Sequence, residues 1–210
     1  MINLAVEPSV VWRWLAGVFA GPLDASALAA SRTGIEQIAA DAPSPGVAAG
    51  LRRMRQTLDA LPPGPPGVAM LAHAYTRLFS GAGGAAAVPP YESAFTAPNG
   101  RLFGPAEARM RALLADLDLR VADGLAEPAD HIAIELATMA VLADADAPAT
   151  CRAELADGLN GWLHAFAEAC AAHDRSGFYA GAAAAAAALA DHEIRTGRAG
   201  ANAMSQGDEQ

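Results

Sequence analysis

Apolar residues recur every three or four positions along most of the chain, the spacing that places side chains on one face of an α-helix. The clearest case follows the motif at residues 127–131, where the expected buried stripe comprises Ile132, Leu136, Met139 and Ala140. Breaks rich in Gly and Pro separate these stretches. The pattern predicts helices over about 8–20, 24–40, 47–61, 66–80, 105–124, 128–144, 149–173 and 178–195.

The kind of apolar residue also favours helices over strands. The chain has 210 residues and is 53% hydrophobic. These residues are mainly Ala and Leu, which favour helices, whereas Val, Ile and aromatic residues are sparse. We therefore predict an all-α fold, a single-domain bundle of about eight helices over residues 1–195, because this length is ample for one core. Residues 196–210 are small and polar, and we predict a disordered tail there.

The charged residues narrow the possible functions. The net charge is −9, and all 14 basic residues are Arg, so the chain contains no lysine. This excludes a lysine-dependent phosphate loop, a Schiff-base enzyme and a pyridoxal site. An acidic protein is a poor partner for nucleic acid and a better one for a cationic ligand. We therefore expect no nucleic acid and no cofactor.

The cysteines and apolar stretches indicate a reduced, intracellular protein. Cys151 and Cys170 fall in one predicted helix, which would place them roughly 28 Å apart and prevent a disulfide between them. No cluster of His and Cys with ligand spacing indicates a metal. The apolar stretches 10–23 and 178–190 are too short to span a bilayer, so we expect no targeting segment and no stable membrane insertion.

Two polar and aromatic clusters contain the candidate chemistry: Pro89-Pro90-Tyr91-Glu92-Ser93 and Glu127-Pro128-Ala129-Asp130-His131. The second is typical of a helix start, with Pro128 at the first helical position. His131 and Glu135, one turn apart, are candidates for a general base or a metal site. The structural alternative is that Asp130 caps free N–H groups in the first turn and His131 forms a local hydrogen bond. Tyr75 and Phe79 are either core residues or, if exposed beside Tyr91, part of an apolar groove.

These two motifs, in this order, resemble those of the TorD/DmsD family of redox-enzyme maturation chaperones. The segments Tyr75–Gly81 and Phe103-Gly104 also match the family, as do Trp162-Leu163 with Phe166 and Phe178-Tyr179. The resemblance covers about residues 66–189. It implies an all-α cytoplasmic chaperone, not an enzyme, that binds the twin-arginine signal peptide or N-terminal segment of a molybdenum-cofactor oxidoreductase. Such a chaperone holds the apoenzyme until its cofactor is inserted, before export.

The resemblance also implies a peptide-binding site. The residues it implicates are Tyr75, Leu78, Phe79, Pro90, Tyr91, Gly104, Asp130 and His131. Glu92, Ser93 and Glu127 of the same motifs complete the candidate site, because carboxylates around an aromatic groove suit a peptide with paired arginines and an apolar stretch. No catalytic residue and no metal ligand is expected.

Alternative functions remain open at this point. The first is a non-catalytic assembly subunit or scaffold of an oxidoreductase complex, and the second is a hydrolase that uses His131 and Glu135. The chain is expected to be a monomer or a domain-swapped homodimer, as known in the family, because the Pro- and Gly-rich segment 62–67 is a suitable hinge.

Overall fold

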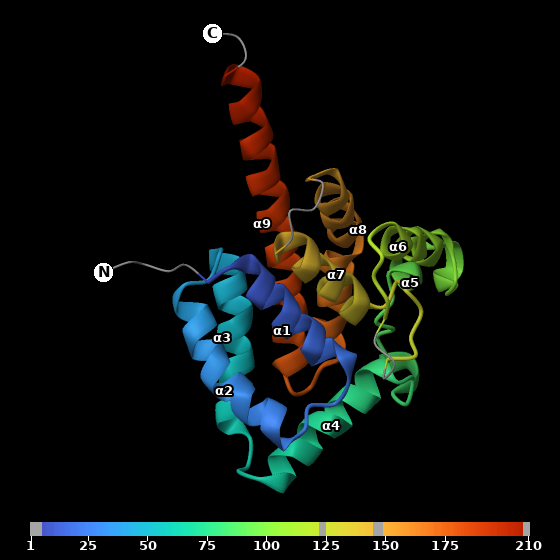
Figure 1. Ribbon diagram of the computed structural model, residues 1–210. Coiled ribbons are helices and arrows are strands. Elements are labelled where there is room, and N and C mark those ends of the chain that lie inside the picture. The colour runs from blue at the N-terminus through green and yellow to red at the C-terminus, as the bar shows by residue number, and fades with distance from the viewer. Residues whose placement is uncertain (1–5, 122–124, 145–148, 208–210) are drawn as a thin grey trace.

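A computed structural model describes residues 6–121, 125–144 and 149–207 of the chain (Figure 1). Within these ranges the backbone forms α-helices and two short 3₁₀ segments, and its one β-type contact is an isolated bridge. The helices are α1 (Pro8–Ala20), α2 (Ala25–Ala40), α3 (Pro45–Ala60), α4 (Pro65–Phe79), α5 (Glu92–Thr96), α6 (Pro105–Asp116), α7 (Ile132–Asp144), α8 (Ala149–His173) and α9 (Phe178–Gly207). The predicted all-α class is confirmed.

The early helix boundaries agree with the sequence because local capping determines them. The side chain of Asp24 accepts a hydrogen bond from the Ala27 N–H at 2.8 Å, so Asp24 caps α2. Ser44 caps α3 in the same way through the Val47 N–H, at 3.3 Å. Such caps satisfy donors that the first turn of a helix leaves free.

The end of α6 differs from the prediction. The helix ends at Asp116, not near residue 124, which lies outside the described residues. Asp118 adopts a positive φ of 51°, and the Leu119 N–H donates to the Leu114 carbonyl at 2.8 Å. This is a Schellman closure formed without glycine, and it ends the helix while the apolar pattern continues.

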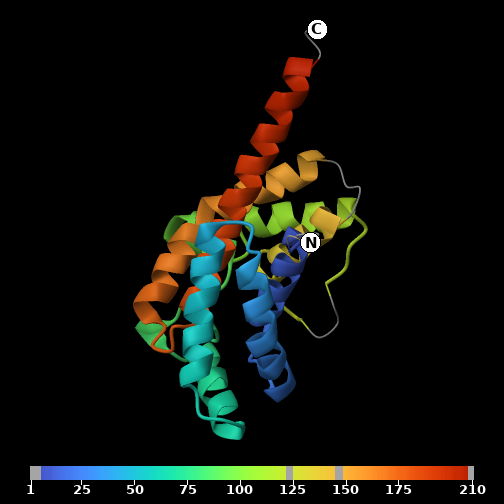
Figure 2. The ribbon, with the colours of Figure 1, turned by 90° about the vertical axis from the view of Figure 1, so that its left-hand side faces the viewer.

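Two further differences concern α5 and α9. The five-residue helix α5, directly after Tyr91, was not predicted. The backbone of α9 is helical to Gly207, beyond the predicted end at residue 195. It therefore enters the segment predicted to be a disordered tail, of which residues 208–210 lie outside the described residues. Figures 1 and 2 show α9 projecting beyond the other helices.

The core lies between α7 and its neighbours. The most extensive helix contacts join α3 to α9, α1 to α7 and α8 to α9. In α7 only Ala137, Val141, Ala143 and Asp144 are not buried. A helix that is apolar nearly all round belongs inside a domain, so α7 is the central helix, and the motif before it is held by the core.

The contact between α3 and α9 brings two backbones together. A Cβ atom added at Gly50 would lie 2.7 Å from the Ala185 nitrogen and 2.7 Å from the Gly181 carbonyl oxygen. A Cβ added at Gly181 would lie 2.8 Å from the Gly50 carbonyl oxygen. The alanine run of α9 is buried beside this crossing. Small residues are therefore required on both helices here.

None of the helices in the described ranges is long and apolar enough to cross a membrane.

The close crossing predicts that Gly50→Ala destabilises the protein by about 2 kcal/mol, because the new methyl group meets backbone atoms that cannot rotate away. Urea unfolding monitored by circular dichroism measures this change. Gly17→Ala in α1 is the matched control, since its Cβ would meet no atom within 4 Å. That control is expected to be neutral or stabilising by about 0.5–1 kcal/mol, as for an exposed helical glycine. Equal effects of the two substitutions would contradict the packing account.

Candidate functional site

The two sequence motifs meet through a short antiparallel pairing between residues 90–92 and 130–132. Tyr91 and His131 form the bridge. The Glu92 N–H donates to the Asp130 carbonyl at 3.0 Å, and the Ile132 N–H donates to the Pro90 carbonyl at 2.9 Å. Tyr91 and His131 are thus a non-hydrogen-bonded pair, in which side chains approach closely on one face.

This pairing changes the start of α7. The sequence predicted a helix from Pro128, but α7 begins at Ile132, four residues later. Residues 128–131 instead form a turn, closed by the His131 N–H donating to the Pro128 carbonyl at 3.0 Å. The Asp130 carbonyl and the Ile132 N–H instead bond to the first motif, so the pairing holds the segment directly before α7.

Tyr91 has an aromatic contact and a hydrogen bond within the second motif. Its ring lies edge-on to the His131 ring, with 5.2 Å between ring centroids. Its hydroxyl donates to Glu127 Oε2 at 2.7 Å. Burial first, and then the bond to Glu127, raise the pKa of Tyr91 above its usual range. The hydroxyl therefore stays protonated and donates to Glu127, which is exposed at the surface.

Asp130 and His131 cap different helices. Asp130 does not cap its own helix as the structural alternative expected, because its Oδ2 accepts from the Ser93 N–H of α5 at 3.0 Å. His131 forms the expected local hydrogen bond, with its Nδ1 accepting from the Ala133 N–H at 3.2 Å. The ring proton is therefore assigned to Nε2. Burial lowers the pKa of His131, so the ring is neutral at neutral pH.

Most of the predicted site residues are buried. Asp130 and Ser93 are fully buried, and His131 is 2% exposed. Pro90 and Glu92 are also buried, whereas Tyr91 and Gly104 are half-buried and Glu127 is exposed. We call the paired motifs, residues 89–93 and 127–131, the frame. Glu127 and the edge of Tyr91 are the parts of the frame that a ligand reaches directly.

The structure places Tyr75, Leu78 and Phe79 in the core and not on the surface. Phe79 contacts the rings of Phe19 and Tyr179, at centroid distances of 5.8 and 5.3 Å. The Tyr75 hydroxyl donates to the Phe19 carbonyl at 2.9 Å. Of the two alternatives for Tyr75 and Phe79, the core position is the one observed. The three residues support the site from inside, so we do not assign them to the ligand surface.

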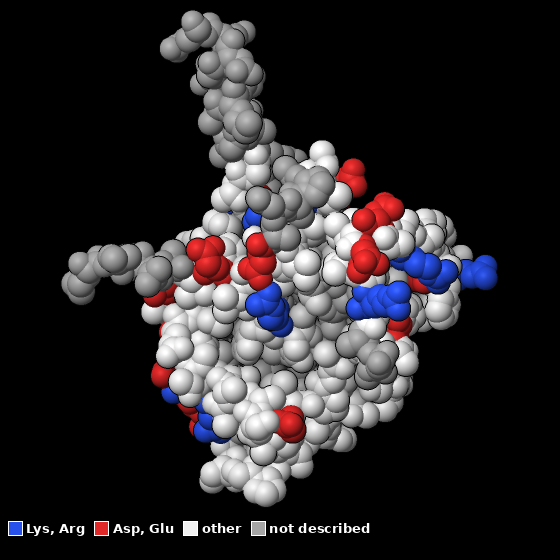
Figure 3. Space-filling view, in the orientation of Figure 1, with Lys and Arg blue, Asp and Glu red and all other residues white. Residues whose placement is uncertain are grey.

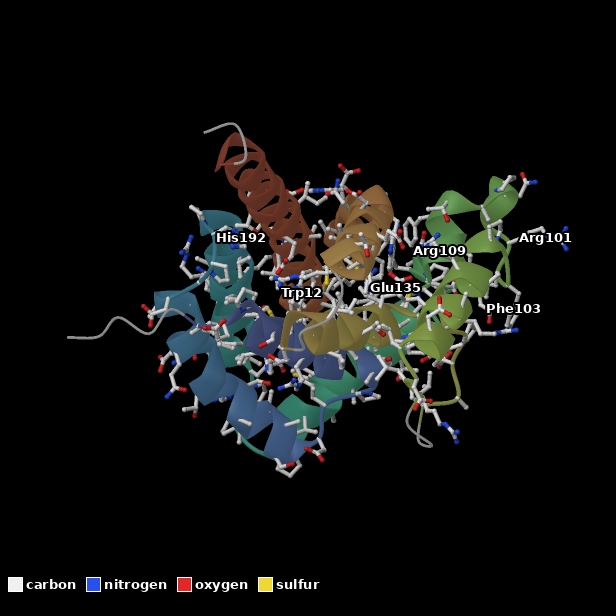
Figure 4. The ribbon with its side chains drawn as sticks, turned by 45° about the horizontal axis from the view of Figure 1, so that its top comes forward. Trp12, Arg101, Phe103, Arg109, Glu135 and His192 are labelled. Carbon is white, nitrogen blue, oxygen red and sulfur yellow. The ribbon has the colours of Figure 1, made fainter. Side chains whose placement is uncertain are left out.

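Two acidic residues, Glu92 of the first motif and Glu135 of α7, are buried at the site. Glu135 is fully buried and Glu92 is 4% exposed. Trp162 Nε1 donates to Glu135 Oε2 at 3.1 Å, and Arg109 of α6 forms an ion pair with Glu92. Figure 4 shows Glu135 in the interior of the molecule, with Arg109 on its α6 side.

The hydrolase alternative finds no support in this geometry. The Nδ1 of His131 is bonded to backbone, and both His131 and Glu135 are buried. No three His, Cys, Asp or Glu side chains of the described residues come together as metal ligands. Both cysteines lie in α8 without a disulfide. Cys170 is buried, and burial raises the pKa of its thiol, so this thiol is not an activated nucleophile.

A groove adjoins the frame, and sequence reasoning missed it. It has a volume of about 630 Å³ and lies between the end of α6 and residues 126–129. Its walls include Leu114, Leu119, Val121 and the motif residues Glu127 and Pro128. A second hollow of about 240 Å³ shares three of these apolar walls and continues along α7 to Val141.

Phe103 forms one rim of the groove. It is 72% exposed and has a φ of 60°, which is strained for a bulky residue. Figure 4 shows it at the outer edge of the molecule. The sequence does contain a signal for this rim, because Phe103-Gly104 is one of the segments that resemble the family. The Schellman turn that forms the opposite wall had no such signal.

Comparison with known proteins identifies the class. The fold resembles that of a solved protein described as a redox enzyme maturation protein from Archaeoglobus fulgidus, with a TM-score of 0.54 at 20% identity. That alignment covers 93% of this chain and 98% of the other, so the fold is shared throughout. Residues 40–172 match the family model described as nitrate reductase delta subunit. The chain belongs to this nitrate reductase delta subunit family.

Named relatives agree with the motif resemblance. The chaperone protein TorD of Shewanella loihica is 35% identical over 114 residues, covering 52% of this chain and 54% of that protein. TorD of Vibrio cholerae serotype O1 is 36% identical over 105 residues, covering 45% of this chain and 47% of that protein. The match thus spans about half the length of each relative. The resemblance to the TorD/DmsD chaperones is confirmed, and the relatives are named as chaperones, not as enzymes.

The neutral, buried ring of His131 predicts a pH dependence of stability. Its folded pKa lies below the unfolded value of 6.5, so its contribution is present above pH 6.5 and is lost as the pH falls through the folded pKa. His131→Asn keeps a capping oxygen but cannot titrate. Urea unfolding at pH 7, 6 and 5 should show a shallower loss for this variant, by at most about 1.4 kcal/mol per pH unit.

The control is His73→Asn, at an exposed histidine of α4. It should leave the pH profile of the wild type unchanged. Parallel profiles for wild type and His131→Asn would show that His131 does not titrate differently on folding.

Proposed function

We propose that this protein is a chaperone in the maturation of a molybdenum-cofactor oxidoreductase. It binds an N-terminal segment of the client, such as a twin-arginine signal peptide, until the cofactor has been inserted. The observation that carries the proposal is the frame of paired motifs, which presents Glu127 beside an apolar groove. The names of the TorD relatives and the shared maturation fold support it.

The groove suits an apolar segment of peptide. Its volume of about 630 Å³ falls in the range of ligand pockets, about 300–1,000 Å³. Of the large apolar side chains that are exposed among the described residues, Phe103 and Val141 line the two hollows. Exposed apolar surface concentrated at a concave place is typical of a binding site. The apolar stretch of a signal peptide is a suitable occupant.

Charge suggests how such a peptide is oriented. Glu127 is an exposed acidic residue, and the chain has a net charge of −9, so both attract arginines. Arg111 and Arg120 also line the groove. Figure 3 shows basic and acidic side chains side by side over the α6 edge of the molecule. We therefore place the arginines of the peptide at Glu127 and its apolar part along Leu114 and Val121.

The buried motif residues have a supporting role in this proposal. Asp130, His131, Glu92 and Ser93 fix the backbone from which Tyr91 and Glu127 project, and do not contact the peptide themselves. Action in the cytoplasm, before export, follows from the kind of client. Monomer and domain-swapped dimer through the segment 62–67 both remain compatible with this binding surface.

The description of the matching family as a subunit favours one alternative, a stable assembly subunit of an oxidoreductase. The two functions differ in when the client dissociates. A subunit purifies with the mature, cofactor-loaded enzyme in fixed stoichiometry, whereas a chaperone purifies with the apoenzyme and is released after cofactor insertion. Affinity purification from cells grown with and without molybdate distinguishes them.

Isothermal titration with synthetic N-terminal peptides of the molybdoenzymes encoded in the same genome tests the proposal. One native peptide should bind tightly, and its Arg-Arg→Gln-Gln form should bind about tenfold more weakly, the loss of a charge-assisted hydrogen bond. The difference between the two peptides should shrink at high salt, because screening weakens exposed charge pairs. Equal binding of both forms, or binding of neither, would remove the peptide assignment.

Two variants test the two parts of the proposed binding surface, the acidic part at Glu127 and the apolar part at Phe103. Glu127→Gln should weaken the native peptide about tenfold and have little effect on the Gln-Gln peptide. Phe103→Asn should weaken both peptides while leaving stability equal or higher, because Asn tolerates a positive φ. The controls are Glu168→Gln on α8 and Met70→Ala on α4, both at exposed positions, and neither should change binding. A loss as large in the controls as in the variants would refute the location of the site.

A further inference from the structure

The two buried acidic residues Glu92 and Glu135 are not fully balanced by cations. Glu92 and Glu135 are both buried, but Arg109 is the one cation paired with either of them in the described structure. The Glu135 carboxyl accepts from Trp162 through Oε2 only. Its Oε1 is buried and has no donor among the described residues. A buried carboxylate oxygen without a donor is costly, whereas a protonated one is itself a donor.

The Glu92 carboxyl is the acceptor available to a protonated Glu135. The Glu92 carboxyl lies within hydrogen-bonding reach of Glu135, and it also carries the Arg109 ion pair. Burial first, and the negative charge of Glu92 second, raise the pKa of Glu135 well above its ordinary value of 4.5. Two neighbouring carboxyl groups then carry one negative charge, which Arg109 balances.

We propose that Glu135 is protonated in the folded protein and donates from Oε1 to the Glu92 carboxylate, so that one proton joins α7 to α5. Glu92 directly follows Tyr91, and its N–H bonds the Asp130 carbonyl. The shared proton therefore fixes the segment that presents Tyr91 to Glu127. Glu135 is a positioning residue of the candidate site, and its effect on peptide binding rests on the proposed function.

The other elements around Glu135 bring no competing charge. Arg13 is the one charged residue of α1, and it pairs with Asp144 at the far end of α7. The charged residues of α8 nearest Trp162, namely Asp157, His164 and Glu168, are exposed. Asp130 faces the Ser93 N–H, and the neutral His131 faces Tyr91. Glu92 and Arg109 are thus the charged groups that interact electrostatically with Glu135.

A second buried glutamate provides the contrast. Glu193 of α9 is 5% exposed and accepts from Trp12 Nε1 at 3.4 Å, much as Glu135 accepts from Trp162. It also accepts two hydrogen bonds from Arg152, at 3.0 and 2.6 Å. Arg152 is therefore a direct cationic partner of Glu193, whereas Glu135 has no cation of its own within the described ranges. The two tryptophan-bonded glutamates should respond to the same substitution in opposite ways.

The first test is stability against pH for wild type, Glu135→Gln and Glu193→Gln. Gln at position 135 keeps an acceptor for Trp162 and a donor for Glu92, but it cannot ionise. The folded pKa of Glu135 lies above the unfolded value of 4.5, so its stabilisation is full below pH 4.5 and is lost as the pH rises through the folded pKa. The unfolding constant of wild type, relative to Glu135→Gln, should rise by up to about tenfold per pH unit in that window.

Glu193→Gln should destabilise the protein at pH 7, because it breaks the ion pair with Arg152. Infrared difference spectra of the protein with ¹³C-labelled glutamate give a direct readout. At pH 7 a protonated carboxyl band should be present in wild type and in Glu193→Gln, and absent in Glu135→Gln. A missing band in wild type, or a loss of stability in Glu135→Gln equal to that in Glu193→Gln, would overturn the shared proton.

Peptide titration tests the positioning role separately. Glu135→Gln should bind the native peptide as wild type does, whereas Glu135→Met, which has neither donor nor oxygen acceptor, should bind about tenfold more weakly when folded. Equal binding by Glu135→Met would refute the positioning role and leave the infrared result standing. Failure of wild type itself to bind any peptide would count against the proposed function and not against the shared proton.

Discussion

The antiparallel pairing of residues 90–92 with residues 130–132 is the constraint on which the rest of the site depends. It directs Tyr91 and His131 to one face, moves the start of α7 from Pro128 to Ile132, and leaves Glu127, just before the largely buried turn, at the surface. Two backbone hydrogen bonds of 3.0 and 2.9 Å would be marginal alone. The Asp130 side chain, bonded to the Ser93 N–H, adds a third link that water does not reach.

The bundle holds this pairing in place from behind. Phe95 of α5 packs on Trp162 and Phe166 of α8, with ring centroids 5.6 and 5.8 Å apart. Trp162 also donates to Glu135, so one side chain supports both α5 and α7. Helix α8 packs along α9, and α9 crosses α3 at the close contact of Gly50 with Gly181. The paired motifs are therefore connected through α8 to an extensively packed part of the molecule. The buried motif residues therefore hold the exposed residues of the site in place.

The sequence predicted those structural features that are determined by residues close together in the chain. Helical periodicity and the buried stripe of α7 follow from neighbours in the chain, and these predictions are confirmed. The target of Asp130 lies 37 residues away, so a sequence alone favoured capping of its own helix. The sequence allowed Tyr75 and Phe79 to lie either in the core or in an exposed groove. The structure places them in the core because α1 and α9 pack around them. The groove depends on the turn at Asp118, where a non-glycine residue adopts a left-handed conformation.

The central claim is that a client peptide occupies the groove beside the frame. The most direct measurement is an amide spectrum of ¹⁵N-labelled protein during titration with the native peptide, which suits a chain of 21.3 kDa. The account predicts shifts at Phe103, Leu119, Val121 and Glu127, and constant positions for the amides of α2 and α3. Shifts confined to α2 and α3, with the amide of Glu127 unmoved, would contradict it.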